Sequence, residues 1–213
     1  MKAIIVTGGY LPGDFLKDQI QKRHVDLIIC ADSGADALYN AGILPNVLLG
    51  DFDSVDENVF NSFVDQGIKT VRFSSEKDLT DTQIAIKYAI KQGSQKIIIF
   101  GATGLRLDHT LANIYMLEKF IYHAHLKIVD MNNSLELICD EGIHIYHKKE
   151  YKYISLIPIS KKVFGVTTEG LKYKLQGATL SRNSSFGVSN EIINEQGSIA
   201  IKKGLLAIIQ SND

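Results

Sequence analysis

The chain has 213 residues, of which 45% are hydrophobic and 22% charged, so it can bury a sizeable core as one large domain or two small ones. Its 23 basic and 24 acidic residues include no basic block, which argues against a non-specific nucleic-acid-binding protein. Two cysteines are too few for a disulfide framework, and no apolar stretch is long enough for a signal-peptide core or a membrane span, so a cytoplasmic protein without membrane contact is expected.

The first part of the chain alternates β-branched runs with helical patterns. This alternation favours a parallel sheet with helices on both faces. The predicted strands are Lys2–Thr7, Val25–Cys30, Val47–Leu49, Lys69–Phe73, Lys96–Phe100 and Leu126–Asp130. The predicted helices run from Asp14 to about Arg23, from after Asp36 to near Gly42, from Asp56 to Gln66, from Thr80 to about Gln92 and from Leu107 to about His123.

After about Leu135 the pattern changes to short β-like runs separated by glycines, with little room for a helix. The fold class is therefore α/β, with a parallel-sheet α/β domain over residues 1–135 and a small all-β sandwich over residues 136–213. A core of fewer than about eighty residues is marginal, so this second part is expected to lean on the first domain or on another subunit. Its predicted strands are His144–His147, Tyr151–Ile157, Val163–Thr167, Leu171–Leu175, Ser189–Ile193, Ser198–Ile201 and Leu205–Ile209.

Most of the conspicuous Gly, Asp and Ser clusters follow predicted strands, whereas the segments that lead from helices into strands are plain. In parallel sheets ligands bind outside the carboxyl ends of the strands, where these loops gather. A functional site is therefore predicted at that edge of the sheet. The clusters are Ala31–Asp36 (ADSGAD), Gly50–Ser54 (GDFDS), Ser74–Asp81 (SSEKDLTD) and Gly101–His109 (GATGLRLDH).

Asp51 and Asp53 follow the third predicted strand, two residues apart. In an extended chain such side chains project to the same side, and a cation between them relieves their repulsion. Hard carboxylate oxygens with room for water are what Mg²⁺ prefers. The alternative is a solvated aspartate-rich turn, because Asp is common in turns for local hydrogen-bonding reasons.

Asp78 and Asp81 precede and open a predicted helix. A helix cap and a favourable charge at the helix N-terminus explain such aspartates without any ligand. A further carboxylate at the same edge as Asp51 and Asp53 would instead complete a Mg²⁺ site.

The loop after the fifth predicted strand combines glycines with a basic side chain. Glycines there let backbone N–H groups approach a phosphate, and Arg106 offers a bidentate clamp for phosphate oxygens. The alternative is a tight turn with a surface arginine. No GxxxxGK[ST] phosphate loop is present, so nucleotide binding must be of another type. The residues singled out are Gly101, Gly104, Arg106, Asp108 and His109.

Two segments of the second part stand out, Gly170–Tyr173 (GLKY) and Phe186–Glu191 (FGVSNE). Tyr173 offers a stacking face, and Ser189 with Asn190 can hydrogen-bond a heteroaromatic ring. Strand aromatics and polar turn residues are the alternative interpretation.

Taken in order, ADSGAD, LLGDFDS, EKDLTDTQIAI, FGATGLRLDHTLANI, GLKY and FGVSNE resemble the thiamine pyrophosphokinase family. The resemblance runs along nearly the whole chain. It implies transfer of a pyrophosphoryl group from ATP to the hydroxyl of thiamine, giving thiamine diphosphate and AMP, with Mg²⁺ as cofactor. It also implies an ATP-binding catalytic domain, a β-sandwich that binds thiamine, and a homodimer with active sites between subunits.

The resemblance also assigns roles to individual residues, which are carried over to the matching positions of this sequence. The sequence departs from the family at Tyr173, where many members have tryptophan, and at Lys77, where glutamine is frequent. Either Asp78 or Asp108 would accept the hydroxyl proton. The implied metal ligands are Asp51, Asp53 and Asp81; the catalytic set adds Asp78, Arg106 and Asp108; the ATP-binding residues are Asp32, Ser33, Lys77, Thr80, Gly101, Arg106, His109 and Asn113; and the thiamine contacts are Tyr173, Ser189 and Asn190.

Two other functions remain open on the residues alone. The same aspartates would serve another Mg²⁺-dependent phosphohydrolase or nucleotidyltransferase. A non-catalytic nucleotide sensor whose β domain docks a partner is the alternative from a different class.

Overall fold

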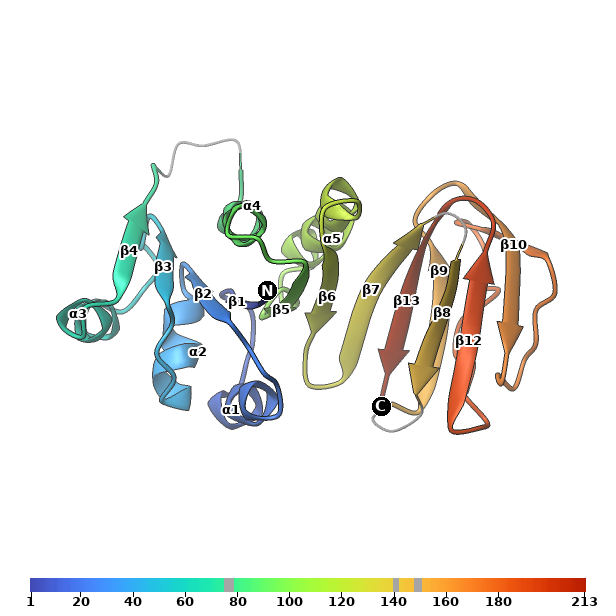
Figure 1. The fold of residues 1–213 in the computed structure, drawn as a ribbon, viewed down its shortest axis with the longest axis horizontal. Coiled ribbons are helices and arrows are strands. Elements are labelled where there is room, and N and C mark those ends of the chain that lie inside the picture. Colours follow the sequence, from blue (N-terminus) through green and yellow to red (C-terminus); the bar gives the residue numbers. More distant parts are fainter. Residues whose placement is uncertain (75–78, 140–141, 148–150) are drawn as a thin grey trace. The chain divides into compact units, whose positions relative to one another are not determined.

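A computed structural model describes residues 1–74, 79–139, 142–147 and 151–213 of the chain. It divides into two compact units, Met1–Met131 and Asn132–Asp213 (Figure 1). Leu135, where the sequence pattern changes, lies inside the first strand of the second unit. No helix in these ranges is long and apolar enough to cross a membrane.

The first unit is built on a parallel sheet of six strands, as the alternating pattern predicts. Their order is β4-β3-β2-β1-β5-β6, so the direction of winding reverses between β1 and β5. Ligands bind at such a reversal in open α/β sheets, because the loops there leave in opposite directions. The strands are β1 (Lys2–Val6), β2 (Leu27–Ala31), β3 (Val47–Gly50), β4 (Lys69–Arg72), β5 (Lys96–Phe100) and β6 (His125–Val129).

Helices cover both faces of this sheet, α1 to α3 on one and α4 with α5 on the other (Figure 1). A buried apolar cluster, which includes Leu38 and Phe63, joins the first three helices to the strands. The helix predicted over Leu107–His123 ends earlier and continues as one 3₁₀ turn. The helices are α1 (Gly13–Gln21), α2 (Gly34–Ala41), α3 (Glu57–Asp65), α4 (Asp81–Lys91), α5 (Leu107–Met116) and η1 (Leu117–Phe120).

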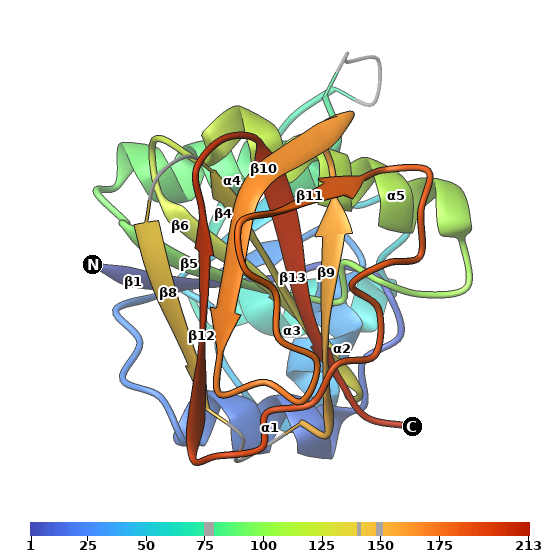
Figure 2. The same ribbon diagram turned by 90° about the vertical axis from the view of Figure 1, so that its right-hand side faces the viewer.

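The second unit packs two antiparallel sheets around its own apolar core, as in the predicted sandwich. In one sheet the order is β7-β13-β9, and in the other it is β11-β10-β12-β8; Figure 2 shows β8, β12 and β10 side by side. The strands are β7 (Asn133–Cys139), β8 (Gly142–His147), β9 (Tyr153–Pro158), β10 (Lys162–Glu169), β11 (Ala178–Ser181), β12 (Gln196–Ile201) and β13 (Leu205–Ser211).

Two predicted strands of the second unit, Leu171–Leu175 and Ser189–Ile193, are loops that make only isolated bridges. Side chains take some of the backbone groups that a ladder would use: the hydroxyl of Thr168 accepts the N–H of Leu175 at 2.9 Å. Apolar alternation predicted these strands, but local side-chain hydrogen bonds compete with sheet pairing.

Candidate active site

The loops after β1 and β5 meet at the reversal of strand order. The N–H of Thr7 donates to the carbonyl of Phe100 at 2.9 Å, and the N–H of Gly9 donates to the carbonyl of Gly101 at 2.8 Å. A Cβ on Gly9 or Gly101 would overlap a carbonyl oxygen of the facing loop, and Gly101 also has φ +71°. Only glycine allows this approach. Gly8 and Gly9 are not among the residues that the sequence motifs single out, although two consecutive glycines directly after a predicted strand are the signal for such packing.

The loop after β2 lies beside the loop after β3. Asp32 has φ 47° and donates its N–H to the carbonyl of Leu49 at 2.8 Å. The position of a Cβ on Gly50 is 3.2 Å from the Cα of Asp32, so the two aspartate-containing loops are in contact. Ser33 is the N-cap residue of α2 without a side-chain cap bond.

Cys30 lies in the buried part of β2, next to these loops. Burial, first of all, raises the pKa of its thiol, and the charges of Asp32 and Asp36 add to the effect. The thiol therefore stays protonated, and Cys30 is a small core residue rather than a nucleophile.

Asp51 and Asp53 lie on one turn at the end of β3, Asp51 half-buried and Asp53 exposed. The N–H of Asp53 donates to Oδ1 of Asp51 at 3.2 Å. Phe52 between them has φ 66°, a left-handed conformation that costs a non-glycine residue about 1–3 kcal/mol. Such strain is typical of functional turns and is retained only where surrounding contacts impose it.

Across the described part of the chain, no three His, Cys, Asp or Glu side chains gather closely enough to hold a metal ion. Mg²⁺ is commonly held by one or two carboxylates together with substrate phosphates and water. The two hard carboxylates of the Asp51–Asp53 turn fit that description, while a contribution from Asp81 stays a prediction.

The start of α4 is tied to the loop after β1. The hydroxyls of Thr7 and Thr82 are 3.2 Å apart and hydrogen-bonded. Thr80 caps the helix by accepting the N–H of Gln83 at 3.2 Å, and Asp81 is the first helical residue, where a negative charge is favourable. Lys77 and Asp78, also predicted for the site, lie outside the described residues.

Arg106 and Asp108 form a bidentate ion pair at the start of α5, with Nε to Oδ1 at 3.2 Å and Nη2 to Oδ2 at 2.6 Å. The guanidinium of Arg106, by its hydrogen bonds first of all, lowers the pKa of Asp108 to about 2. Hydrogen bonding to Asp108 likewise raises the pKa of Arg106, so its positive charge is retained. Both side chains are exposed, as is His109 in the same helical turn.

Three further side chains hold the loop after β5 in place. Asn113 donates to the carbonyl of Ala102 at 2.8 Å, so its amide fixes the loop from inside. Thr103 donates to Oδ2 of Asp130 at 2.8 Å. Thr103 and Asp130 were not predicted, because their 27-residue separation gives no local signal.

In the second unit, Tyr173 is 60% exposed and Asn190 only 4%. The amide of Asn190 accepts the N–H of Tyr173 at 3.0 Å and donates to its carbonyl at 2.7 Å. Ser189 has φ 57° and donates its N–H to the hydroxyl of Ser155 at 2.9 Å. Lys172 pairs with Glu191 at 2.8 Å and places its Nζ 5.6 Å from the centre of the Tyr173 ring. Tyr173 thus presents an exposed ring on a backbone that Asn190 holds.

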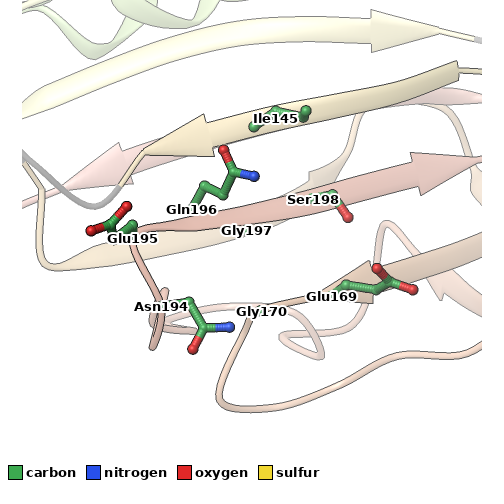
Figure 3. A pocket seen from close by; sticks show the side chains of 8 residues that line it. All are labelled: Ile145, Glu169, Gly170, Asn194, Glu195, Gln196, Gly197 and Ser198. Atoms are coloured by element: carbon green, nitrogen blue, oxygen red, sulfur yellow. The ribbon is translucent and has the colours of Figure 1, made fainter.

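A hollow of about 540 Å³ lies elsewhere on the second unit (Figure 3). Its lining is mainly polar, and it includes none of the three residues predicted to contact thiamine. The lining residues are Ile145, Glu169, Gly170, Asn194, Glu195, Gln196, Gly197 and Ser198.

Comparison with known families decides which proteins this arrangement belongs with. The model of the thiamin pyrophosphokinase catalytic domain matches residues 19–129, and that of the thiamin pyrophosphokinase vitamin B1 binding domain matches residues 141–206. The chain belongs to the thiamin pyrophosphokinase family. Membership confirms the family, the enzyme class and the fold class that the sequence motifs predict.

Individual relatives and solved structures agree with this assignment. Thiamine pyrophosphokinase of Bacillus subtilis (strain 168) is 33% identical over 217 residues, covering 100% of both chains. Thiamine pyrophosphokinase 2 of Arabidopsis thaliana is 28% identical over 81% of this chain and 73% of its own. The crystal structure of the Bacillus subtilis enzyme superposes with a TM-score of 0.90 at 32% identity, again over 100% of both chains. That of thiamin pyrophosphokinase from Geobacillus thermodenitrificans gives 0.87 at 34%, over 100% and 98%.

Proposed function

We propose that this chain transfers a pyrophosphoryl group from ATP to the hydroxyl of thiamine, which gives thiamine diphosphate and AMP. The observation that carries the proposal is the meeting of four loops at the carboxyl edge of the parallel sheet, in a chain whose two parts match the two domains of one kinase family. Such a transfer needs positioning and charge neutralisation more than covalent help from the protein. The positioning comes from these loops, which are held in place by close contacts at their glycines.

Asp51 and Asp53 are the proposed Mg²⁺ ligands. The family resemblance adds Asp81 as a third, although these three described residues do not form a metal-holding group in this structure. Their oxygens are the hard donors that this ion takes, and the turn at Phe52 holds the first two on one short segment. When bound, Mg²⁺ supplies neutralisation of charge on the transferred phosphates.

The nucleotide is proposed to bind across the loops after β2 and β5 and the start of α4. Arg106 contributes a permanent positive charge that can clamp phosphate oxygens. Gly101 keeps the loop after β5 packed against the loop after β1. Thr80 and Asn113 act by fixing the helix start and the loop. The full set, carried over from the family resemblance, is Asp32, Ser33, Lys77, Thr80, Gly101, Arg106, His109 and Asn113.

The proton acceptor for the thiamine hydroxyl is the finer part of the proposal. While Asp108 is paired with Arg106, its pKa of about 2 makes it a weak base at neutral pH. This favours Asp78, the other candidate that the sequence offers, over Asp108. Asp108 then serves to orient Arg106.

Thiamine is proposed to stack on Tyr173, whose ring is exposed, next to Ser189 and Asn190. An aromatic face suits the flat heteroaromatic rings of thiamine and its thiazolium charge. The amide of Asn190 is engaged by the backbone of Tyr173, so we propose that Asn190 acts mainly by holding the ring in place.

We also propose a cytoplasmic homodimer with active sites between subunits, without nucleic-acid or membrane partners. Its support is an exposed apolar stripe on α5 with helical spacing, in which Leu107 is 73%, Leu111 49% and Tyr115 51% exposed. A second copy of the chain would bury this stripe.

One assay tests the proposed activity. The chain is incubated with ATP, Mg²⁺ and thiamine, and AMP is expected to appear in step with thiamine diphosphate. ADP or orthophosphate without thiamine dependence would mean a different phosphohydrolase or transferase, and tight ATP binding without turnover would mean a nucleotide sensor. Sedimentation of the same sample tests the dimer.

A further inference from the structure

Phe52 is the strained residue of the aspartate turn. Within the described ranges, the non-glycine residues with positive φ are Asp32, Phe52 and Ser189. Asp tolerates the left-handed region because its short side chain can hydrogen-bond locally, but a phenylalanine gains nothing of this kind. Two hydrogen bonds within the turn, from the N–H of Asp53 to Asp51 and from the N–H of Val55 to the carbonyl of Phe52, contribute to holding it. Contacts of the Phe52 ring add to them.

The first such contact comes from α3. The rings of Phe52 and Phe60 have centroids 4.9 Å apart and planes inclined at 43°. Both side chains are only half-buried. Both also pack against the buried apolar cluster of the first unit.

The second contact comes from the end of β4. The Cζ of Arg72 is 5.4 Å from the centre of the Phe52 ring and 5.1 Å from that of Phe60, so the guanidinium lies over both rings. Arg72 is the last residue of β4 and is in register with Gly50, the residue before Asp51. The N–H of Phe73 also donates to the carbonyl of Gly50 at 3.1 Å. The backbone that carries the guanidinium is thus tied to the backbone that carries the turn.

We propose that Arg72 is a positioning residue for the reaction, acting through Phe52. Its guanidinium holds the Phe52 ring against Phe60, which keeps the turn left-handed and keeps the Asp51 and Asp53 carboxylates in one arrangement toward metal and phosphate. The inference rests on the proposed function, because it gives these carboxylates their task. Nothing in it requires Arg72 to touch a substrate.

Lys69 provides a matched control on the same strand. It is the first residue of β4, at the opposite edge of the sheet, and its Nζ lies 5.7 Å from the centre of the Tyr88 ring. An R72A variant removes the cation–ring contacts to Phe52 and Phe60, and a K69A variant removes the contact to Tyr88. Only R72A removes such contacts beside the aspartate turn.

For R72A we expect kcat/KM to fall by about 10- to 100-fold, the size of effect that misplacing catalytic groups produces. The Mg²⁺ concentration for half-maximal rate should rise about fivefold, in line with loss of the cation–π contact between Arg72 and the Phe52 ring. K69A should stay within about twofold of wild type, as for an ordinary surface substitution. R72K keeps the charge without the planar fork and should recover part of the activity.

A glycine substitution at position 52 tests whether Arg72 acts through the Phe52 ring or contacts the substrate directly. An F52G variant adopts the positive φ without strain but lacks the ring. If Arg72 acts through Phe52, adding R72A to F52G causes no further loss. If the two losses multiply instead, Arg72 contacts the reactants directly and the proposal is wrong.

A structural readout is independent of catalysis. The amide resonance of Asp53, whose N–H donates to Asp51, should shift in R72A and not in K69A, with thermal unfolding showing that both variants fold. An unchanged Asp53 resonance together with wild-type activity in R72A would overturn the proposal. If the wild-type enzyme forms no AMP, the proposed function fails instead, and the resonance still tests the role of Arg72.

Discussion

The side-chain amide of Asn190 hydrogen-bonds both backbone groups of Tyr173, accepting its N–H at 3.0 Å and donating to its carbonyl at 2.7 Å. The same Oδ1 accepts the N–H of Glu191 at 2.9 Å. A buried side chain thus takes the place of a neighbouring strand. The exposed ring of Tyr173 depends on it for position.

Replacing Asn190 by alanine should therefore affect stability and thiamine binding together. Leaving these part-buried N–H groups without their acceptor costs about 1 kcal/mol of unfolding free energy, the lower end of the range for buried groups. We expect a higher KM for thiamine and an unchanged KM for ATP, measured with denaturant unfolding on the same samples. N190D keeps the acceptor oxygen and loses the N–H donor, so its stability and its KM for thiamine should lie between those of the wild type and N190A. An equal rise of both KM values would contradict a role confined to the Tyr173 loop.

Asp53→Asn should lower turnover by about 100-fold or more while leaving stability nearly unchanged. Removing one charge from a pair of repelling carboxylates does not harm folding. Asp56→Asn is the matched control: Asp56 caps α3 by accepting the N–H groups of Asn58 and Val59, and asparagine caps equally well. Rate and melting temperature are measured for both variants. Normal turnover in D53N would exclude Asp53 from the metal site.

Gly101→Ala tests the close packing of the loops after β1 and β5. The new methyl group would meet the carbonyl oxygen of Thr7 and require φ +71°. Gly93, with φ +88° and no atom within 4 Å of an added Cβ, separates the two causes. We expect G93A to cost about 1 kcal/mol and G101A about 3 kcal/mol or more in denaturant unfolding. Equal costs would mean that backbone conformation alone matters at Gly101.

The ion pair between Arg106 and Asp108 predicts an acid-range effect. The pKa of Asp108 lies at about 2, below its ordinary 3.8, because Arg106 hydrogen-bonds the carboxylate. When folding lowers the pKa of a carboxyl group, its ionised form stabilises the folded protein at pH values above the unfolded-state pKa. For Asp108 this stabilisation disappears as the pH falls from 3.8 to about 2. The effect is small and salt-sensitive because both side chains are exposed.

An NMR titration of the Asp108 carboxyl checks this prediction. The midpoint should lie near 2 in the wild type and move toward 3.8 in an R106A variant or at high salt. The acid limb of the pH–rate profile should lie at the same pH in D108N as in the wild type, because Asp108, with a pKa of about 2, is already ionised over that limb. A wild-type midpoint at 3.8 would show that the pair does not persist in solution.

Much of the architecture follows from the sequence, because local rules govern it. β-Branched runs alternating with helical spacing indicate a parallel sheet, and the side of each loop follows from chain direction alone. For this reason the amino-acid pattern alone assigns Asp32, Asp51 and Arg106 to one edge of the sheet. The same rules overpredicted strands at Leu171–Leu175 and Ser189–Ile193, where apolar alternation is present but isolated backbone bridges and hydrogen bonds with side chains stand in place of a continuous ladder.

Only the tertiary structure decides the contacts between residues that are far apart in the chain. The reversal between β1 and β5 makes Gly9 and Gly101 neighbours, and Arg72 meets the ring of Phe52 because β4 lies beside β3. A periodic pattern specifies which face of an element is apolar, but not which element it meets. Packing makes that choice, since it selects among many pairings of similar apolar faces.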